Sequence, residues 1–395
     1  MPEKFVYADN AATTRVSQSV LDAMLPYFGE KYGNPSSLHS KGRAASAALG
    51  DARARIAKLL GAKESEIYFT ASGSEADNWA IKGAAYANRD RGRHIVSTKI
   101  EHHAVLNSLK SLEREGFEVT LVDVDQGGRV SPEAVANAVR EDTVLVSVMT
   151  ANNEVGTIEP IAEISAAVKR KNRKTLIFTD AVQAAGTLML DVGELGVDML
   201  SLSGHKLHAP KGVGALYIRN GIRVSNLIDG GGQERSRRGG TENLPYIMGL
   251  AKALEDAVAG INENARVAAM RDRLIDGILD KIPYTRLNGA REQRLPGNVN
   301  ISFDYIEGES LLLWLDMNGI CASTGSACSS ASLAASHVLL ALGVPVESAH
   351  GSLRLSLGRD NTDDDVDYIL QVLPGIVERL RAMSPLYEKV NGSKI

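Results

Sequence analysis

Short apolar runs alternate with longer amphipathic stretches between about residues 40 and 220. Several of the runs are apolar at consecutive positions, as in strands that are covered on both faces. They predict strands at Glu66–Thr70, His94–Thr98, Glu118–Val122, Thr143–Met149, Thr175–Thr179, Met199–Ser203 and Gly214–Ile218. The stretches between them predict helices at Ser40–Leu60, Glu75–Arg91, Ala104–Glu115, Pro132–Val139 and Ile161–Lys171. This alternation is typical of an α/β fold with a mainly parallel seven-stranded sheet and helices on both faces.

The pattern changes after about residue 255, where a long charged helix is expected over Glu255–Lys281. Two further strands and two further helices are predicted at Asn298–Phe303, Glu309–Met317, Ser352–Leu357 and Asp364–Met383. We therefore expect a large domain over residues 15–255 and a smaller α+β domain over residues 1–14 and 256–395. The smaller domain would carry a mobile cysteine loop at about residues 321–336. The polar tail Ser384–Ile395 is expected to be loose.

Composition narrows the classes of partner. The 395 residues carry a net charge of −4, which gives no footprint for nucleic acid or an anionic membrane. No apolar run reaches the ~18 residues of a membrane-spanning helix, and Met1–Lys4 lacks the layout of a signal peptide. The two cysteines, Cys321 and Cys328, indicate neither a disulfide framework nor a metal site. A reducing cytoplasm is the expected location.

Chemistry-bearing residues follow the predicted strands, at the sheet edge where such folds bind ligands. Lys206 emerges just after the buried strand that ends at Ser203. A lysine beside packed apolar surface and a second cationic group is suited to nucleophilic use, such as a Schiff base with an aldehyde cofactor. A plain surface lysine is the alternative, and Lys211 competes for the role. Asp180 ends another strand and could pair with a protonated pyridine nitrogen, or could simply cap a turn.

The segment Thr70–Ala76 joins a strand to a helix, whose N-terminus favours a phosphate group. Ser74 could add a hydroxyl there, although an ordinary helix cap needs the same residue type. Ser203 and His205 could donate further hydrogen bonds. His102 follows another strand, where an imidazole could stack on a flat ring and move protons. Asn153 could bond a phenolic oxygen or a carboxylate, or belong to a turn.

Two residues of the second half stand out. Arg354 lies in an alternating strand, where an inward guanidinium needs an anion: a substrate carboxylate, or an internal Asp or Glu. Cys328 lies among small, polar residues that allow exposure and movement, as a sulfur carrier requires, although an idle thiol is the alternative. Cys321 follows a turn into a strand and is expected to be a buried structural thiol.

Together these segments resemble the cysteine desulfurases of the NifS/IscS group, class V aminotransferase relatives that use pyridoxal 5'-phosphate (PLP) on the type I fold. The resemblance covers nearly the whole chain in order. It rests on eight segments: Asp9–Thr14, Gly33–Ser37, Glu101-His102, Asn152–Gly156, Asp180–Gln183, Ser203–Lys206, Arg238–Asn243 and Gly325–Cys328.

The resemblance implies a role for each matching residue. Lys206 would carry the cofactor, Asp180 would pair with its pyridine nitrogen, and His102, chosen over His103, would stack on its ring. Gln183 would bond the phenolic oxygen. The phosphate would be held by Ser74, Ser203 and His205, and by Thr241 of the neighbouring subunit in a homodimer. Arg354 and Asn153 would bind the substrate carboxylate, and Cys328 would attack the substrate sulfur.

The implied activity converts L-cysteine to L-alanine and leaves the sulfur as a persulfide on Cys328, for a sulfur acceptor or an iron–sulfur scaffold protein. A selenocysteine lyase, an aminotransferase and a non-catalytic sulfur-relay scaffold are the alternatives. The chain departs from the family at three places. Ser74 replaces a usual threonine, the loop reads Ser332–Ser336 where relatives carry Glu-Pro, and the tail lacks the end by which some members dock a scaffold. The acceptor is therefore left open.

Overall fold

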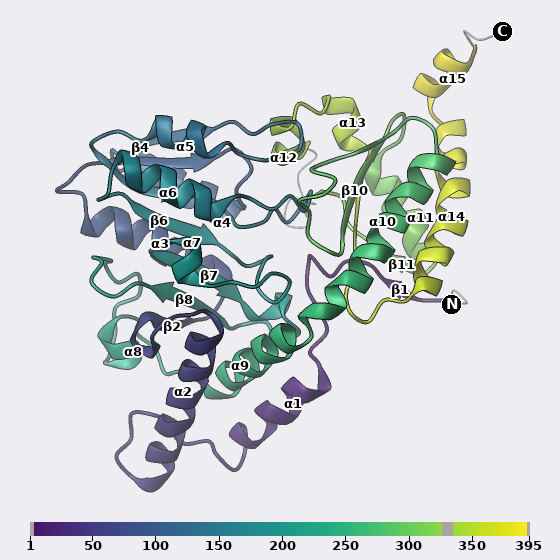
Figure 1. The fold of residues 1–395 in the computed structure, drawn as a ribbon. Coiled ribbons are helices and arrows are strands. Elements are labelled where there is room, and N and C mark those ends of the chain that lie inside the picture. Colours follow the sequence, from purple (N-terminus) through teal and green to yellow (C-terminus); the bar gives the residue numbers. More distant parts are fainter. Residues whose placement is uncertain (1–3, 326–334, 393–395) are drawn as a thin grey trace.

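A seven-stranded sheet forms the centre of the computed structural model, which describes residues 4–325 and 335–392 (Figure 1). In sheet order its strands are β2 (Ile67–Thr70), β8 (Gly214–Ile218), β7 (Met199–Ser203), β6 (Leu176–Asp180), β5 (Thr143–Ser147), β3 (His94–Thr98) and β4 (Glu118–Val122). Only β8 runs against the others. The predicted α/β class with a mainly parallel sheet is confirmed, and the consecutive apolar positions are explained because every strand but the edge strand β4 is buried throughout.

Helices cover both faces of this sheet. One face packs under α3 (Gly73–Ala87) and α4 (His103–Glu113). The other face packs against α2 (Ser40–Leu59), α5 (Pro132–Ala138), α6 (Ile161–Lys171), α7 (Val192–Leu195) and α9 (Leu244–Ala259). Because helices cover both faces of the sheet, polar side chains can meet a ligand only at the edge that is formed by the carboxyl ends of the parallel strands.

A second hydrophobic core lies beside the first. It contains the antiparallel sheet β12–β10–β9 (Ser352–Ser356, Asn298–Phe303 and Thr285–Leu287) and the helices α10 (Asn264–Lys281), α11 (Gly308–Met317) and α14 (Asp363–Ala382). The N-terminal strand β1 (Val6–Tyr7) belongs to this core and pairs in parallel with β11 (Ile320–Cys321). Two short helices, α12 (His337–Ala341) and α13 (Val346–His350), lie between β11 and β12.

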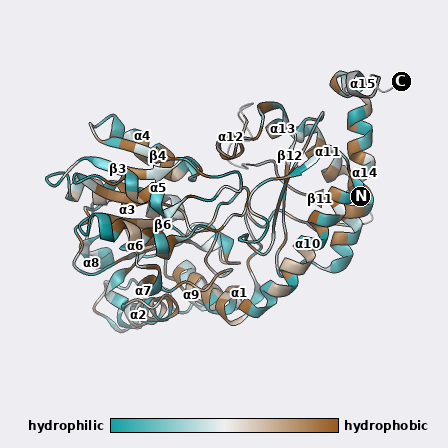
Figure 2. Cartoon of the chain, turned by 45° about the horizontal axis from the view of Figure 1, so that its top comes forward, coloured by the Kyte–Doolittle hydropathy of each residue, from teal (hydrophilic) through white to brown (hydrophobic). Residues whose placement is uncertain are grey.

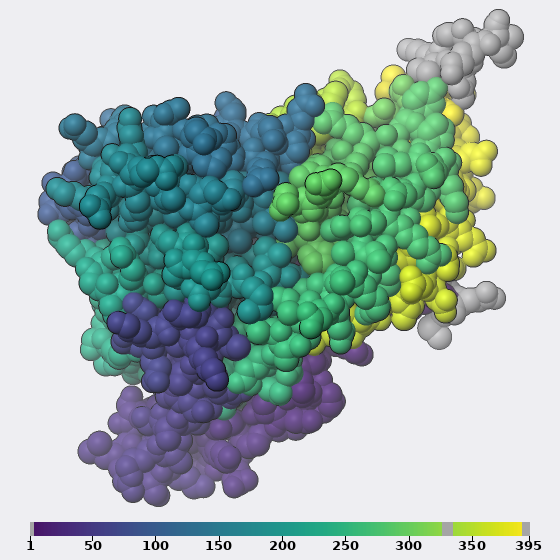
Figure 3. All heavy atoms as spheres, viewed as in Figure 1, coloured from purple at the N-terminus to yellow at the C-terminus, as the bar shows by residue number. Residues whose placement is uncertain are grey.

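The segment that follows β1 in the sequence and leads into α2 projects from the body of the molecule (Figures 1 and 3). It contains α1 (Gln18–Met24), the 3-10 turn Leu25–Tyr27 and the start of α2. Large apolar side chains are exposed along it: Leu21, Leu25, Phe28, Tyr32 and Leu38. A further short helix, α8 (Gln233–Ser236), lies beside β2 (Figure 1).

Two sequence expectations are wrong. The single helix over Glu255–Lys281 is two helices, because α9 ends at Ala259, and Gly260 and a 3-10 turn (Ile261–Glu263) separate it from α10. Glycine has a low helix propensity and gives the chain its break. The tail contains the helix α15 (Pro385–Gly392), whose Tyr387 ring packs against Tyr284 and Tyr305. The other predicted ends coincide with the structure or differ from it by up to four residues, and the largest difference is at α3, which ends at Ala87.

The flanking helices are striped with hydrophilic and hydrophobic residues rather than apolar all round (Figure 2). Of the helices that the structure describes, none combines the length and the apolar character needed to cross a membrane. This striping is the pattern of helices that bury one face against a core.

Candidate active site

Nine of the eleven predicted site residues line one cavity of ≈ 200 Å³ at the carboxyl ends of the central strands. They are Ser74, His102, Asn153, Asp180, Gln183, Ser203, His205, Lys206 and Arg354. Strands β2, β7, β6, β5 and β3 point the same way, so the loops that follow them converge at this edge. Thr241 is exposed and does not line the cavity of its own chain, and Cys328 lies outside the described residues.

Lys206 closes a short 3-10 turn (Gly204–Lys206) directly after β7. Its Nζ donates hydrogen bonds to the carbonyl oxygens of Ala11 and Ala12, at 2.5 and 2.7 Å. The side-chain amide of Gln183 donates to the same Ala11 oxygen at 3.0 Å. The N-terminal segment thus crosses from the second core to the lysine. The competing Lys211 is exposed and does not line the cavity.

Asp180 is the last residue of β6 and is buried. Its Oδ1 accepts a hydrogen bond from the backbone amide of Val182 at 2.9 Å. Burial raises the pKa of Asp180, and the neighbouring charges of His102 and Lys206 oppose this shift. A carboxylate so placed can pair with a cationic ring nitrogen, since each cation nearby favours its ionised form.

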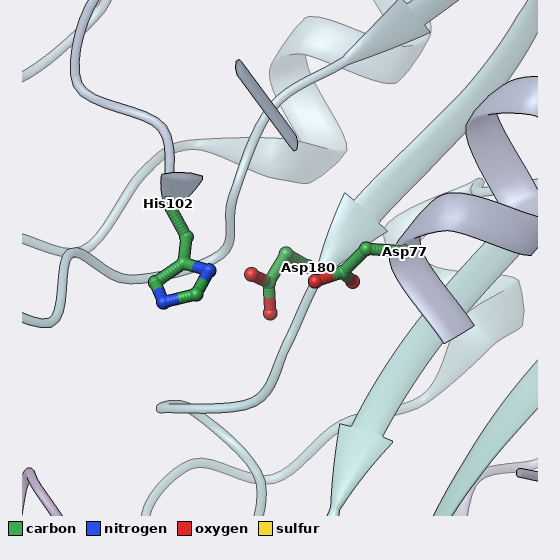
Figure 4. Close-up of side chains that lie close together, drawn as sticks. All are labelled: Asp77, His102 and Asp180. Carbon is green, nitrogen blue, oxygen red and sulfur yellow. The ribbon is translucent and has the colours of Figure 1, made fainter. Parts of the chain in front are cut away.

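Asp77, His102 and Asp180 point toward one another, and one ligand atom from each lies within 4.8 Å of the other two (Figure 4). Such spacing would also suit a metal ion, which the sequence did not predict. A metal ion and a pyridine nitrogen would compete for the same Asp180 oxygen atoms. Asp77 was missed from the sequence because it lies inside α3, where an acidic residue usually faces solvent.

His102 caps α4, and its Nδ1 accepts a hydrogen bond from the Ala104 amide at 3.1 Å. The preceding turn is fixed by the buried Glu101, which accepts from Thr98 Oγ1 at 2.7 Å and from the Met149 amide at 3.0 Å. His103 instead packs its ring against His337, with centroids 4.7 Å apart. Of the two histidines, His102 is the one in the cavity.

The N-terminus of α3 forms the end of the cavity that suits a phosphate group. The helix cap is Ser72, whose hydroxyl accepts from the Glu75 amide at 3.1 Å, so the capping role considered for Ser74 is wrong. Ser74 lies exposed in the first turn and lines the cavity. A Cβ on Gly73 would meet Val182 at 2.8 Å and Ser203 at 3.2 Å, so only glycine allows this close approach. Burial, with help from Lys206 and Lys211, lowers the pKa of His205 to about 4, which keeps its ring neutral.

Arg354 of β12 is buried, and the ion pair that the sequence left open is present. Its Nη2 lies 3.1 Å from Asp9 Oδ1, while its Nη1 donates to the carbonyl oxygens of Asn153 at 3.0 Å and Gly325 at 3.2 Å. Its Nε is buried with no hydrogen-bond partner among the described residues. Burial raises the pKa of Asp9 despite this ion pair, so Asp9 is a weaker partner than a free carboxylate would be.

Cys321 forms the end of β11, as its turn-into-strand pattern predicted, but the expectation of a buried thiol is wrong, because the side chain is half-buried in a sheet of two strands. Burial raises the pKa of its thiol, and the charges of Asp316 and Asp9 add to that shift. A raised pKa leaves less thiolate at neutral pH, so Cys321 is poorly suited to nucleophilic attack.

The residues of the cavity fit PLP. A neutral histidine, two serines and a helix N-terminus suit a phosphate, and the buried Asp180 suits a pyridine nitrogen. Lys206 lines the same cavity, and its Nζ is the group there that can bond an aldehyde carbon. The orphaned Nε of Arg354 adds a donor for a carboxylate.

Comparison with known proteins agrees with this chemistry. Residues 6–369 match the Aminotransferase class-V family. A cysteine desulfurase IscS of Methanosarcina thermophila is 57% identical over 98% of this chain and 95% of its own length. A solved NifS-like protein superposes with a TM-score of 0.90 at 42% identity, covering 95% of this chain and all of that one. A structure of SspA in complex with cysteine superposes with a TM-score of 0.79 at 35% identity, covering 89% of this chain and 98% of that one. The chain belongs to the aminotransferase class-V family.

Proposed function

We infer that this protein is a PLP-dependent cysteine desulfurase, which converts L-cysteine to L-alanine and takes the sulfur onto its own cysteine. The observation that carries this conclusion is the meeting of nine residues from six separate sequence segments in one cavity. Relatives named as cysteine desulfurases match over nearly the full length. The alternatives of selenocysteine lyase, aminotransferase and non-catalytic scaffold are not favoured by these relatives.

The cofactor is held at three points. The α3 N-terminus, Ser74, Ser203 and neutral His205 would bind its phosphate, Asp180 would pair with its pyridine nitrogen, and Lys206 would bond its aldehyde carbon. His102 would cover the ring, and Gln183 would bond the phenolic oxygen. When bound, PLP supplies an electron sink for the carbanion that forms at the substrate α-carbon.

Substrate binding uses the second core. Arg354 binds the carboxylate of L-cysteine with its guanidinium, and the side-chain amide of Asn153 adds a hydrogen bond. The substrate carboxylate competes with Asp9 for Nη2, which is favourable because the pKa of Asp9 is raised by burial. Lys206 would take the α-proton of the substrate on its Nζ.

Sulfur transfer is assigned to Cys328. Its thiolate attacks the substrate sulfur, and the bond between that sulfur and Cβ breaks with its electron pair staying on carbon. Protonation of the carbon fragment gives alanine, and Cys328 keeps the sulfur as a persulfide. A sulfur-acceptor or iron–sulfur scaffold protein then takes it.

The active unit is a homodimer. Thr241 is exposed and away from the cavity of its own chain, which fits a role in the phosphate site of a second copy. The projecting segment with exposed Leu25, Phe28 and Leu38 supplies apolar surface for such a contact. We also propose the division into a large domain (15–255) and a small domain (1–14 and 256–395), and a cytoplasmic location.

The test is purified protein loaded with PLP and given L-cysteine. We expect equal amounts of alanine and of sulfur, the latter found as persulfide on Cys328 by mass spectrometry. Lys206→Ala should lose the absorbance of the lysine-bound cofactor, and Cys328→Ser should lose alanine release but still change the absorbance with L-cysteine. Full alanine release by Cys328→Ser would contradict the assignment. Turnover that required a keto acid would indicate an aminotransferase, and a marked preference for selenocysteine would indicate a lyase.

A further inference from the structure

Behind Asp180 lies a second buried carboxyl group, that of Asp77 on α3, which is 2% exposed. Asp77 Oδ1 lies 2.6 Å from the hydroxyl oxygen of Ser201. Ser201 is on β7, where its backbone is the register partner of Asp180 on β6. A hydrogen bond from the same Ser201 hydroxyl also helps the ionised form of Asp180. The serine thus stands between the two carboxyl groups.

The two carboxyl groups cannot both be ionised in this buried place without a large energetic cost. Asp180 has relief from charges on two other loops, His102 before α4 and Lys206 after β7. Among the described residues, Asp77 has the Ser201 hydroxyl as its one favourable partner, and it faces the negative charges of Asp180 and Glu101. Burial and Asp180 raise the pKa of Asp77 well above its ordinary value. The proton of the pair therefore belongs on Asp77.

A hydroxyl group has a single hydrogen to donate. If Ser201 donates it to ionised Asp180, the contact of 2.6 Å with Asp77 needs a donor on the Asp77 side. We propose that Asp77 is a positioning residue that carries a proton and donates it through Ser201, so that a chain Asp77–Ser201–Asp180 holds Asp180 ionised and oriented toward the cofactor nitrogen. This proposal rests on the role proposed above for Asp180.

The test compares Asp77→Asn with Asp77→Ala in the PLP-loaded dimer. Asparagine keeps a donor for Ser201 and carries no charge, so Asp77→Asn should bind PLP within about twofold of the native protein. Asp77→Ala and Ser201→Ala should each weaken PLP binding by about tenfold, the worth of one hydrogen bond to a charged group. The double variant should be no weaker than either single one, since both break the same chain.

A spectroscopic measurement separates the proposed positioning role of Asp77 from a merely structural one. The pH midpoint of the bound-cofactor absorbance should move in Asp77→Ala and in Ser201→Ala, and stay in place in Asp77→Asn. Weakening by Asp77→Asn as large as by Asp77→Ala would show that Asp77 acts as a charge and would overturn the proposal. Unchanged binding and midpoint in Asp77→Ala would overturn it as well.

Asp180→Asn distinguishes this proposal from the one on which it rests. That variant should lose far more PLP affinity than either Asp77 variant if Asp180 pairs with the pyridine nitrogen. If it binds PLP normally, the assignment of Asp180 fails, whatever the Asp77 variants do. A buried acid away from the cavity, Glu159, serves as control, and Glu159→Gln should leave both PLP binding and the absorbance midpoint unchanged.

Discussion

Several acids of this protein are buried, and each whose pKa is raised by burial makes stability depend on pH. Glu159 is the clearest, since its Oε2 accepts only the Val130 amide at 2.9 Å and its Oε1 has no partner among the described residues. Burial raises its pKa to about 8. The folded protein therefore binds a proton that the unfolded chain releases near its ordinary pKa.

The sign of this linkage gives the first prediction. Because the folded pKa lies above the unfolded one, stability falls as the pH rises from about 4.5 to about 8. Glu159→Gln removes the buried charge, so it should raise the free energy of unfolding by roughly a few kcal/mol at pH 9 and change it little at pH 4. Urea denaturation at both pH values measures this. A variant equally destabilised at both would show that the amide itself does not fit.

A glycine at the phosphate end is a second residue-scale determinant. Gly73→Ala would press its Cβ against Val182 and Ser203, which lie at 2.8 and 3.2 Å. We expect PLP affinity to fall by at least about tenfold because the α3 N-terminus must shift, and cofactor fluorescence titration measures this. Gly50→Ala is the matched control, since nothing lies within 4 Å of that position in α2. It should leave PLP binding unchanged and stabilise the helix by ~0.5–1 kcal/mol.

At the scale of elements, the base of the cysteine loop is tied to the loop after β5. Glu154 is buried, its carbonyl oxygen accepts from Asn298 at 3.1 Å and from Asn300 at 3.0 Å, and its carboxylate accepts from the Ser336 hydroxyl. A Cβ on Gly325 would come within 2.6 Å of the same carboxylate. One side chain therefore touches both described ends of the segment that contains Cys328.

Removing the contacts of the Glu154 side chain should change the reactivity of the Cys328 thiol without changing the absorbance of the bound cofactor. Glu154→Ala should change the rate of Cys328 alkylation by iodoacetamide severalfold, because the loop ends lose a shared contact, while PLP absorbance stays unchanged. Glu154→Gln keeps an acceptor for Ser336 and should restore the native rate. Glu159→Ala is the control for losing a buried acid elsewhere. Equal alkylation rates in all of these proteins would show that Glu154 does not position the loop.

The elements also show what a sequence pattern can and cannot predict. The sheet strands were found because they are short, β-rich runs, several of them apolar at consecutive positions, and helical stretches separate them. Gly260 was overlooked because one glycine inside a long amphipathic stretch does not break its periodicity, and α15 was missed because its polar residues resemble a loose tail. In the cavity, residues that follow strands were predicted. Asp77 and Glu101 were not, because their importance comes from burial by distant segments.

At the scale of the whole molecule, the cavity is shared between two hydrophobic cores. The large core supplies Lys206, Asp180 and the phosphate end, while the smaller core supplies Arg354 and the N-terminal carbonyl groups that hold Lys206. The cysteine substrate would bridge the two cores through its carboxylate. Substrate affinity should therefore depend on how the two cores are placed relative to each other.

The last prediction concerns the second copy of the chain. Leu38 is 90% exposed on the projecting segment, near Phe28 and Tyr32 in sequence, and such apolar side chains are rarely left to water together. Leu38→Asp should shift the protein from dimer toward monomer in analytical ultracentrifugation at micromolar concentration. Its PLP affinity should fall with it, since Thr241 of a second copy would be lost from the phosphate site. Leu313→Asp, 69% exposed on α11, is the control and should remain dimeric. A native protein that sediments as a monomer with full PLP affinity would contradict both the dimer and the role of Thr241.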